Sequence, residues 1–248
     1  MARGCNYGRG LVLNLFTLRP SKHAQGGPAL RGKKDLVTTA ADESKFVELV
    51  RNWLVSLPQD VKIAFDAMDD ENLPRPVREI AAGVVAYVVS PNDPIQDRND
   101  VVVSYADDAL LLRMALTKAL GKEEDEEAFR DRFPELFEGL DEHLALCSSI
   151  MGDLMTWLES KLPSLPTMDY KGKKVAKYLD DTEAREQLYD DSLVFRTDYP
   201  VDEKTIGDKL KKASTVTDVM RRRKAEEART KGASTRTAAG AKAPASGR

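Results

Sequence analysis

The chain has 248 residues, a formal net charge of −3, 42% apolar residues and 32% charged residues. Its two cysteines lie far apart, which excludes a disulfide framework, and they provide no metal-binding spacing with the two histidines. No apolar run reaches the roughly 18–20 residues needed to span a bilayer. These totals exclude the disulfide-rich and transmembrane classes, and we expect a soluble protein of the cytoplasm.

Charge is unevenly distributed along the chain. Residues 1–35 carry a balance of +6 and residues 209–248 a balance of +9, so a charge of −18 falls on residues 36–208. An acidic body with basic ends is typical of proteins with interaction tails. Residues 1–40 are rich in Gly, Arg and Lys with little periodicity, so we predict a basic, mostly disordered N-terminal segment there.

The first predicted helix begins near Asp42. Its apolar residues recur at intervals of three and four, which is the spacing of one buried helix face. Pro58 is predicted to end this helix and to start a second one, because proline removes a hydrogen bond from a helix interior. The first stripe comprises Phe46, Leu49, Val50, Trp53, Leu54 and Leu57, and the second Val61, Ala64, Phe65 and Met68.

Two further helices flank an acidic segment. One is predicted from about Val77 to the Ser90-Pro91 pair, because the residue before a proline avoids the α region. The other spans Tyr105–Leu120 and ends at Gly121, a residue type that favours helix C-caps. Small residues that allow close approach of another helix lie beside the apolar stripe of the first of these: Ala82, Gly83 and Ala86.

A heptad seam follows Pro134. The three- and four-residue spacing predicts a helix of about 30 residues, on the order of 45 Å long, that Pro163 closes. Two interpretations stay open: the helix is the spine of an intramolecular bundle, or the seam at 137–158 pairs two copies of the chain as a coiled coil. The seam residues are Phe137, Leu140, Leu144, Cys147, Met151, Leu154 and Leu158.

The remaining chain is less regular. Residues 164–208 are predicted to be a mainly helical extension with an extended segment at 192–200. Residues 209–248 are predicted to be a basic, low-complexity tail, in which a helix at 219–232 precedes a disordered end. Strand signals are scarce, so the fold class is all-α. We expect a helical bundle at 41–163, built around a hairpin at 77–120 and one long heptad-patterned helix, with disordered basic termini.

Five aspartates are concentrated in SPNDPIQDRNDVVVSYADD, residues 90–108. Ser104 and Asp107 have capping-box spacing ahead of the Tyr105–Leu120 helix, and Ser90-Pro91 opens a turn. Capping and turn formation therefore explain some of these aspartates. Contact with a partner is a second interpretation. A third is a Mg²⁺ or Ca²⁺ site, although the spacing is not that of an EF-hand, with oxygen ligands from Asp93, Asp97, Asp107 and Asp108.

The stretch AYVVSPNDPIQD…SYADDALLL resembles the YkvA-like family, a bacterial domain of unknown function. The resemblance covers about residues 77–118 and implies a helical hairpin with an acidic corner. It implies no reaction, because the family has no agreed activity. The chain departs from the family pattern at Pro94, Gln96 and 98–100, where polar residues disfavour membrane insertion of the hairpin. The matching positions are Tyr87, Ser90, Pro91, Asp93, Ile95, Asp97, Tyr105, Asp107, Asp108 and Ala109.

The sequence contains no Gly-rich phosphate loop, nucleophile elbow or HExxH motif. His143 and Cys147 are four residues apart, but a Cys–His dyad also needs an orienting group and a cleft. We therefore expect a non-catalytic α-helical interaction protein of YkvA-like type, without a cofactor and with a protein as its partner.

Two alternatives to this function stay open. A divalent-metal-binding protein or phosphoester hydrolase would use the aspartate corner. A protein associated with nucleic acid or an anionic membrane surface would use the basic tail, since mobile cations suffice to bind phosphates. The tail could equally be solubilising or fold back on the acidic body. Its densest cluster of basic residues is Arg221, Arg222, Arg223 and Lys224.

Overall fold

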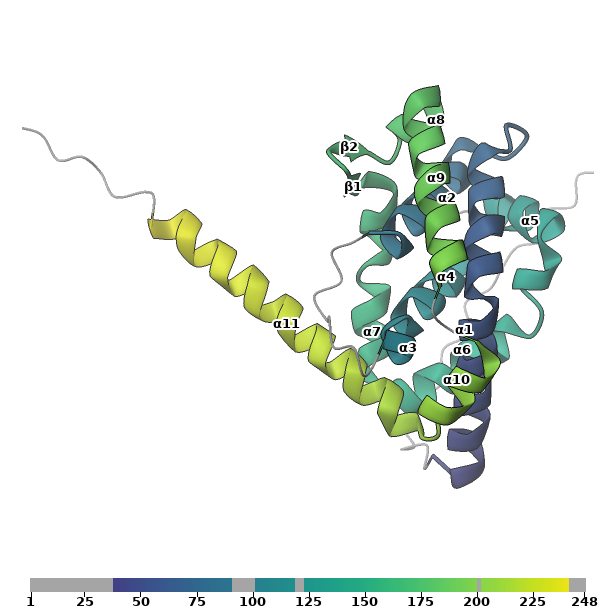
Figure 1. Ribbon diagram of the computed structural model, residues 1–248, viewed down its shortest axis with the longest axis vertical. Coiled ribbons are helices and arrows are strands. Elements are labelled where there is room, and N and C mark those ends of the chain that lie inside the picture. The colour runs from purple at the N-terminus through teal and green to yellow at the C-terminus, as the bar shows by residue number, and fades with distance from the viewer. Residues whose placement is uncertain (1–37, 91–100, 119–122, 200–201, 241–248) are drawn as a thin grey trace, which may run out of the picture. The chain divides into compact units, whose positions relative to one another are not determined.

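A computed structural model describes residues 38–90, 101–118, 123–199 and 202–240 (Figure 1). Apart from one two-stranded hairpin, the described elements are helices, which confirms the all-α class. In chain order they are α1 (Ala40–Asp69), α2 (Arg75–Val88), α3 (Val101–Ser104), α4 (Ala106–Lys118), α5 (Glu123–Arg132), η1 (Pro134–Leu136), α6 (Leu140–Met151), α7 (Asp153–Glu159), η2 (Leu162–Thr167), β1 (Asp169–Tyr170), β2 (Lys173–Lys174), α8 (Lys177–Asp180), α9 (Thr182–Asp198), α10 (Glu203–Lys209) and α11 (Ala213–Gly240).

Helix α1 is capped at its start by its own sequence. The Thr39 side chain accepts a hydrogen bond from the Asp42 amide at 3.2 Å, and the Asp42 carboxylate accepts one from the Thr39 amide at 3.2 Å. This reciprocal pair satisfies two amides that a helix start leaves without partners. The hydrogen bonds from Thr39 lower the pKa of Asp42, so the cap favours the charged carboxylate.

Helix α1 runs through Pro58, so the prediction that this proline separates two helices is wrong. Proline has no amide hydrogen, and the helix therefore loses the bond that residue 58 would donate to the Leu54 carbonyl. The Tyr199 hydroxyl donates to that carbonyl instead, at 3.0 Å. The donor comes from the far end of α9, which explains why the local sequence did not indicate a continuous helix.

Helix α2 approaches another element closely at Gly83, as its small residues predicted. A Cβ atom at this position would lie 2.3 Å from the carbonyl oxygen of Leu165 in η2. Real side chains do not come that close, so only glycine allows this packing. The contact places η2, and with it Met168 just beyond, against α2.

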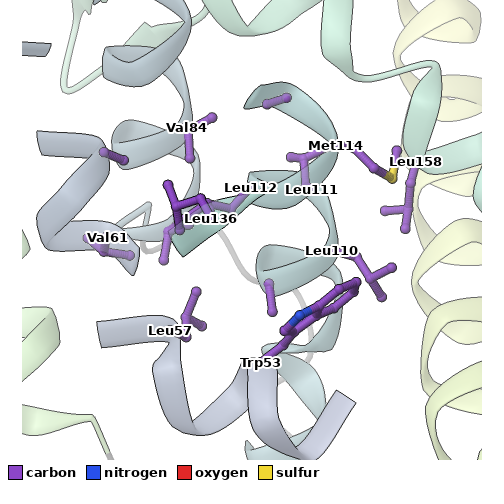
Figure 2. Close-up of a cluster of buried hydrophobic side chains, with 14 of the residues drawn as sticks. Trp53, Leu57, Val61, Val84, Leu110, Leu111, Leu112, Met114, Leu136 and Leu158 are labelled. Atoms are coloured by element: carbon purple, nitrogen blue, oxygen red, sulfur yellow. The ribbon is translucent and has the colours of Figure 1, made fainter. Parts of the chain in front are cut away.

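Helix α4 lies at the centre of the core. All its side chains from Ala106 to Ala115 are buried. A helix that is buried on every side is enclosed by other elements of the fold. Figure 2 shows Leu110 close to Trp53 of α1, Leu112 close to Leu136, and Met114 close to Leu158. Helices α1, α2 and α7 all pack against α4.

A buried ion pair joins α4 to α1. The Arg113 guanidinium donates to the Asp60 carboxylate at 2.6 Å and to the Ser56 hydroxyl at 3.1 Å, and both charged side chains are almost fully buried. Ser56 also donates to Asp60 at 2.8 Å. Burial raises the pKa of Asp60, and the positive charge of Arg113 opposes that shift. The pair fixes the register of α1 against α4.

The heptad seam is divided among the end of η1, α6 and α7, so the prediction of one long helix is wrong. Gly139 precedes α6 with φ 62° and Gly152 separates the two helices with φ 55°. These left-handed conformations interrupt a right-handed helix, and glycine adopts them without a steric cost. All seven seam residues are nevertheless buried within this chain. The seam is therefore the spine of an intramolecular core.

The C-terminal part contributes to the core, which corrects the prediction of a low-complexity tail. Helix α11 spans Ala213–Gly240, and its first turns bury Val216, Val219 and Met220. Leu210, just before it, is fully buried, and its carbonyl accepts a hydrogen bond from Arg51 Nε of α1 at 2.7 Å. The segment predicted as extended at 192–200 is helical as far as Asp198.

None of the described helices combines the length and the apolar character that a membrane crossing requires. Residues 1–37, for which a disordered basic segment was predicted, lie outside the described part of the chain, as do residues 241–248.

Candidate binding pocket

A cavity of about 810 Å³ lies where the end of α2, the start of α4, the end of α7, the β1–β2 hairpin, α9 and α11 meet. A volume of this size falls within the range of sites for small organic ligands, roughly 300–1,000 Å³. Aromatic rings form much of its wall, and several charged side chains lie among them. The aromatic residues of the lining are Tyr87, Tyr105, Trp157, Tyr170 and Phe195.

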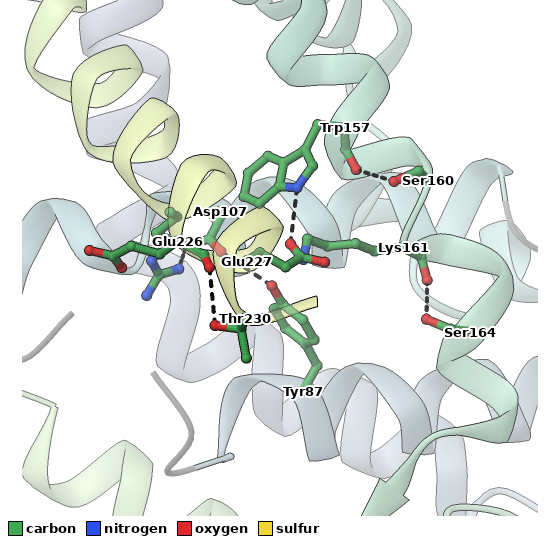
Figure 3. Close-up of polar contacts among 10 residues, drawn as sticks. Tyr87, Asp107, Trp157, Ser160, Lys161, Ser164, Glu226, Glu227 and Thr230 are labelled. Atoms are coloured by element: carbon green, nitrogen blue, oxygen red, sulfur yellow. Dashed lines mark hydrogen bonds and ion pairs between the residues drawn. The ribbon is translucent and has the colours of Figure 1, made fainter. Parts of the chain in front are cut away.

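The deepest charged group of the pocket is Asp107, whose side chain is 3% exposed. One carboxylate oxygen pairs with the Arg223 guanidinium of α11, and the other accepts a hydrogen bond from the Tyr87 hydroxyl at 3.2 Å (Figure 3). Burial raises the pKa of Tyr87, and the charges of Asp107 and Asp108 raise it further. The phenol therefore stays protonated and remains a donor.

A second charged group, Glu227, lies one helical turn further along α11. Its carboxylate accepts a hydrogen bond from the Trp157 indole at 3.0 Å and one from the Lys161 ammonium at 2.7 Å (Figure 3). The Lys161 ammonium also lies 4.6 Å from the centre of the Trp157 ring, within the range of a cation–π interaction.

A third charged group, Asp191, lies on α9 at the β-hairpin. It accepts a hydrogen bond from the Tyr170 hydroxyl at 2.9 Å and pairs with the Lys171 ammonium at 2.7 Å. The ammonium lies 5.6 Å from the centre of the Tyr170 ring. Lys171 has φ 45° and Gly172 φ 79°, so these two residues form the left-handed turn that a two-residue hairpin requires.

The same arrangement therefore occurs three times in one pocket: a carboxylate held by an aromatic donor and paired with a basic side chain. We call these groups the three triads, namely Asp107 with Tyr87 and Arg223, Glu227 with Trp157 and Lys161, and Asp191 with Tyr170 and Lys171. Their basic side chains differ in exposure, from 9% for Arg223 through 18% for Lys161 to 39% for Lys171. The basic side chains of the triads are thus buried in the interior of the pocket and increasingly exposed to solvent towards its rim.

Apart from Ser90, Asp108 and Thr230, the rest of the wall is largely apolar. Tyr105 and Phe195 lie edge to face with ring centres 5.7 Å apart, and both also contact Tyr199, whose hydroxyl bonds to the Leu54 carbonyl. Burial raises the pKa of Tyr199. Val194 of α9 lines the pocket and is 58% exposed, which is unusually high for a residue of its type.

The structure describes two of the four predicted metal ligands. Asp107 and Asp108 are buried at the start of α4, whereas Asp93 and Asp97 lie outside the described residues. Both oxygens of Asp107 are occupied by Tyr87 and Arg223. Within the described ranges, no group of three or more His, Cys, Asp or Glu side chains is placed to hold a metal ion.

The predicted capping residues lie close to the pocket. Ser104 is the last residue of α3 and is buried, and Asp107 is in the first turn of α4. Ser90 lines the pocket, and its amide donates to the Tyr87 carbonyl at 3.3 Å at the end of α2. Pro91 lies outside the described part. Asp107 acts as an ion-pair partner across the fold, which its capping-box spacing did not predict.

The predicted anion-binding cluster lies on α11 and makes internal ion pairs. Arg223 pairs with Asp107, Lys224 with Asp153 at 2.6 Å, and Arg221 with Asp218 at 2.7 Å. The Lys224 ammonium lowers the pKa of Asp153. Arg222 is exposed. Part of the basic segment therefore folds back on the acidic body, and its binding of external anions stays a prediction.

The cysteine and histidine that are four residues apart form no reactive pair. Cys147 is fully buried, and burial raises the pKa of its thiol to about 12, which keeps it protonated and unreactive. His143 lies edge to face with Trp53 at 5.9 Å. Neither residue lines the candidate pocket.

Sequence reasoning missed the α11 contribution to the pocket, although a signal for it exists. Ala213, Val216, Met220, Arg223, Glu227 and Thr230 are spaced three and four residues apart, and all six lie on the packed side or in the pocket wall. The stripe starts apolar and ends polar, so a search for apolar residues alone stops at Met220. Read as one helix face, it indicates a helix that packs first on a core and then on a polar site.

Comparisons of the chain with protein-family models, with curated proteins and with solved structures found no match. The resemblance to the YkvA-like family therefore stays a prediction.

Proposed function

We propose that this protein is a non-catalytic α-helical binding protein, and that the aromatic pocket is where it holds its ligand or partner. The observation that supports the proposal is the recurrence of the triad three times around one cavity of about 810 Å³. Packing stability alone does not account for three ion pairs around one cavity, because buried and partly exposed ion pairs both contribute little net stability compared with apolar packing.

The chemistry of the lining supports binding more than a reaction. Each triad carboxylate already accepts hydrogen bonds from an aromatic donor and from a basic side chain, which leaves fewer lone pairs for a substrate. A general base needs a pKa near the operating pH and a free lone pair directed at its substrate. The aromatic walls, by contrast, offer a large apolar area with few rotatable bonds, as binding sites commonly do.

The proposal is tested with a small neutral probe, 3-phenylpropanol, titrated into the isotopically labelled full chain and followed by NMR. We expect chemical-shift changes at Tyr87, Trp157 and Phe195. A Val194→Trp variant places an indole at the pocket wall and is expected to weaken this binding at least about tenfold, the equivalent of about 1.4 kcal/mol.

A matched control is available on α1. Val55 is 47% exposed and does not line the pocket, so Val55→Trp adds the same surface without filling the site. The variant is expected to bind the probe as the wild type does. Shift changes that map outside the pocket, or equal weakening by both variants, would exclude the pocket as the binding site.

A metal-dependent function has less support from the pocket than ligand binding has. Asp107 would have to release Arg223 and Tyr87 before it could hold Mg²⁺ or Ca²⁺, and breaking a buried ion pair costs several kcal/mol, roughly 3–5. Calorimetric titration with Mg²⁺, Mn²⁺ and Ca²⁺ tests this alternative. A heat of binding that Asp107→Asn removes would revive it.

The outer side of α11 supports a second candidate function, binding of phosphate groups on nucleic acid or membranes. Arg222 and Arg229 are exposed and two turns apart on one face of the helix. The double variant Arg222→Gln, Arg229→Gln is the suitable test, because deletion from residue 209 would also remove the core residues Val216 and Met220. We expect the variant to bind a DNA duplex more weakly and with a smaller salt dependence. An unchanged affinity and slope would exclude this role for the outer side of α11.

A further inference from the structure

We propose that the pocket selects organic cations: ligands with an apolar body and an alkylammonium group. The inference rests on the proposed function, since it names the chemical class of ligand for the same pocket. The cation would be held by a carboxylate and an aromatic ring together, at the Glu227–Trp157 and Asp191–Tyr170 pairs.

The molecule already binds two ammonium groups in this way. The ammonium of Lys161 lies 2.7 Å from Glu227 and 4.6 Å from the Trp157 ring centre, and that of Lys171 lies 2.7 Å from Asp191 and 5.6 Å from the Tyr170 ring centre. Aromatic rings and carboxylates together are the groups by which proteins recognise ammonium ligands. The two lysines thus occupy the positions that we assign to the ligand.

In the Glu227 and Asp191 triads, a ligand can replace the lysine more easily than it can replace the carboxylate. Glu227 and Asp191 are each held by a second donor, Trp157 or Tyr170, which stays in place when a lysine leaves. A lysine has a long flexible stem, and its ammonium can move into water near the pocket rim. An anionic ligand would instead draw the lysine away and leave a partly buried carboxylate without its counter-charge, which is costly.

The net charge of the lining favours a cation as well. The described lining carries four acidic and three basic side chains, the fourth acid being the buried Asp108. The apolar part of the ligand would contact Phe195, Val194 and Val88 beside the triads. A ligand therefore gains from apolar burial while its ammonium replaces one that is already there.

Three probes with the same phenyl ring and three-carbon chain test the selectivity: 3-phenylpropylammonium, 3-phenylpropanol and 3-phenylpropanoate. In NMR titrations of the full chain at neutral pH, we expect the ammonium to bind at least about tenfold more tightly than the propanoate. A second arm uses a short peptide with lysine next to phenylalanine. Tighter binding of the peptide than of the amine would identify the cation as a lysine of a protein partner, and the reverse order would identify a small amine.

Lysine variants distinguish displacement by a cation from attraction of an anion. A partly exposed ion pair favours its closed form by about one- to fivefold, so Lys161→Met or Lys171→Met should tighten ammonium binding about two- to sixfold by removing the competitor. Glu227→Gln and Asp191→Asn should weaken it. Lys174→Met is the control, because Lys174 pairs with Asp169 and does not line the pocket.

The outcomes separate this inference from the proposed function. Binding of the propanoate in the pocket as tightly as the ammonium, or weaker ammonium binding in both lysine variants, would overturn the cation assignment and leave the pocket as a binding site. Absence of pocket shifts with all three probes would overturn both.

Discussion

Replacement of Gly83 by alanine tests the close packing of α2 on η2. An added Cβ would lie 2.3 Å from the carbonyl oxygen and 2.6 Å from the carbonyl carbon of Leu165, whereas ordinary contacts begin at 3.4 Å. The backbone of η2 must therefore move by roughly 1 Å, since a backbone carbonyl cannot rotate away as a side chain can.

The expected loss of stability follows from two opposing terms. Overpacking costs typically 1–3 kcal/mol, and a clash with backbone belongs near the upper end of that range. Alanine in place of glycine in a helix returns about 1 kcal/mol. The net loss in the free energy of unfolding is thus about 2 kcal/mol, which corresponds to a Tm about 4–8 °C lower for a domain of this size.

Gly207 provides the matched control for this experiment. It lies in α10, and a Cβ there would meet no atom within 4 Å, so Gly207→Ala should raise stability by about 0.5–1 kcal/mol. Calorimetry and urea unfolding of both variants measure the difference. If Gly83→Ala were as stable as Gly207→Ala, the close approach of η2 to α2 would be refuted.

Three other changes test further features of the fold. Tyr199→Phe removes the hydroxyl that serves the Leu54 carbonyl and should cost about 1–2 kcal/mol in urea unfolding; a loss that is unchanged when Pro58 is also replaced by alanine would contradict the assigned role. Arg113→Met leaves the Asp60 carboxylate buried without this cation and should lower the free energy of unfolding by about 3–5 kcal/mol at pH 7. This loss should shrink as the pH falls and Asp60 becomes protonated. A loss that does not change with pH would argue against a buried charge. The Cys147 thiol has a pKa of about 12 in the folded chain and about 8.5 when unfolded, so it favours folding below pH 8.5 and loses that contribution as the pH rises further. Compared with Cys147→Ala, the free energy of unfolding of the wild type should fall by about 2 kcal/mol by pH 10. Parallel curves of stability against pH for the two proteins would disprove the shift.

The sequence predicted the helical class and the buried faces better than the ends of the helices. Periodic apolar spacing reports which side chains face the core, and the seam from Phe137 to Leu158 is buried as expected. Helix ends depend on single residues, and contacts with distant parts of the chain decide whether such a residue ends the helix. Pro58 was expected to end a helix, but the hydroxyl of Tyr199, 145 residues away from Leu54 in the sequence, replaces the missing hydrogen bond.

The candidate pocket was the part least accessible to sequence reasoning. Asp107 was identified as notable, yet its spacing indicated a cap or a metal ligand, and Arg223 was assigned to external anions. The two residues pair with each other across the fold, and no local pattern connects them. Neither Glu227 nor Asp191 was predicted to line a binding site, because acids in helices usually lie on the solvated surface.

The ion pair between Asp107 and Arg223 joins residues 116 positions apart. Chains are synthesised at about 5–20 residues per second, so Arg223 is added about 6–23 s after Asp107. During this interval the helices that precede α11 can collapse, but the carboxylate of Asp107 has no guanidinium to neutralise it. Docking of α11 is therefore expected to be the last step of folding during synthesis, and the pocket is completed only then.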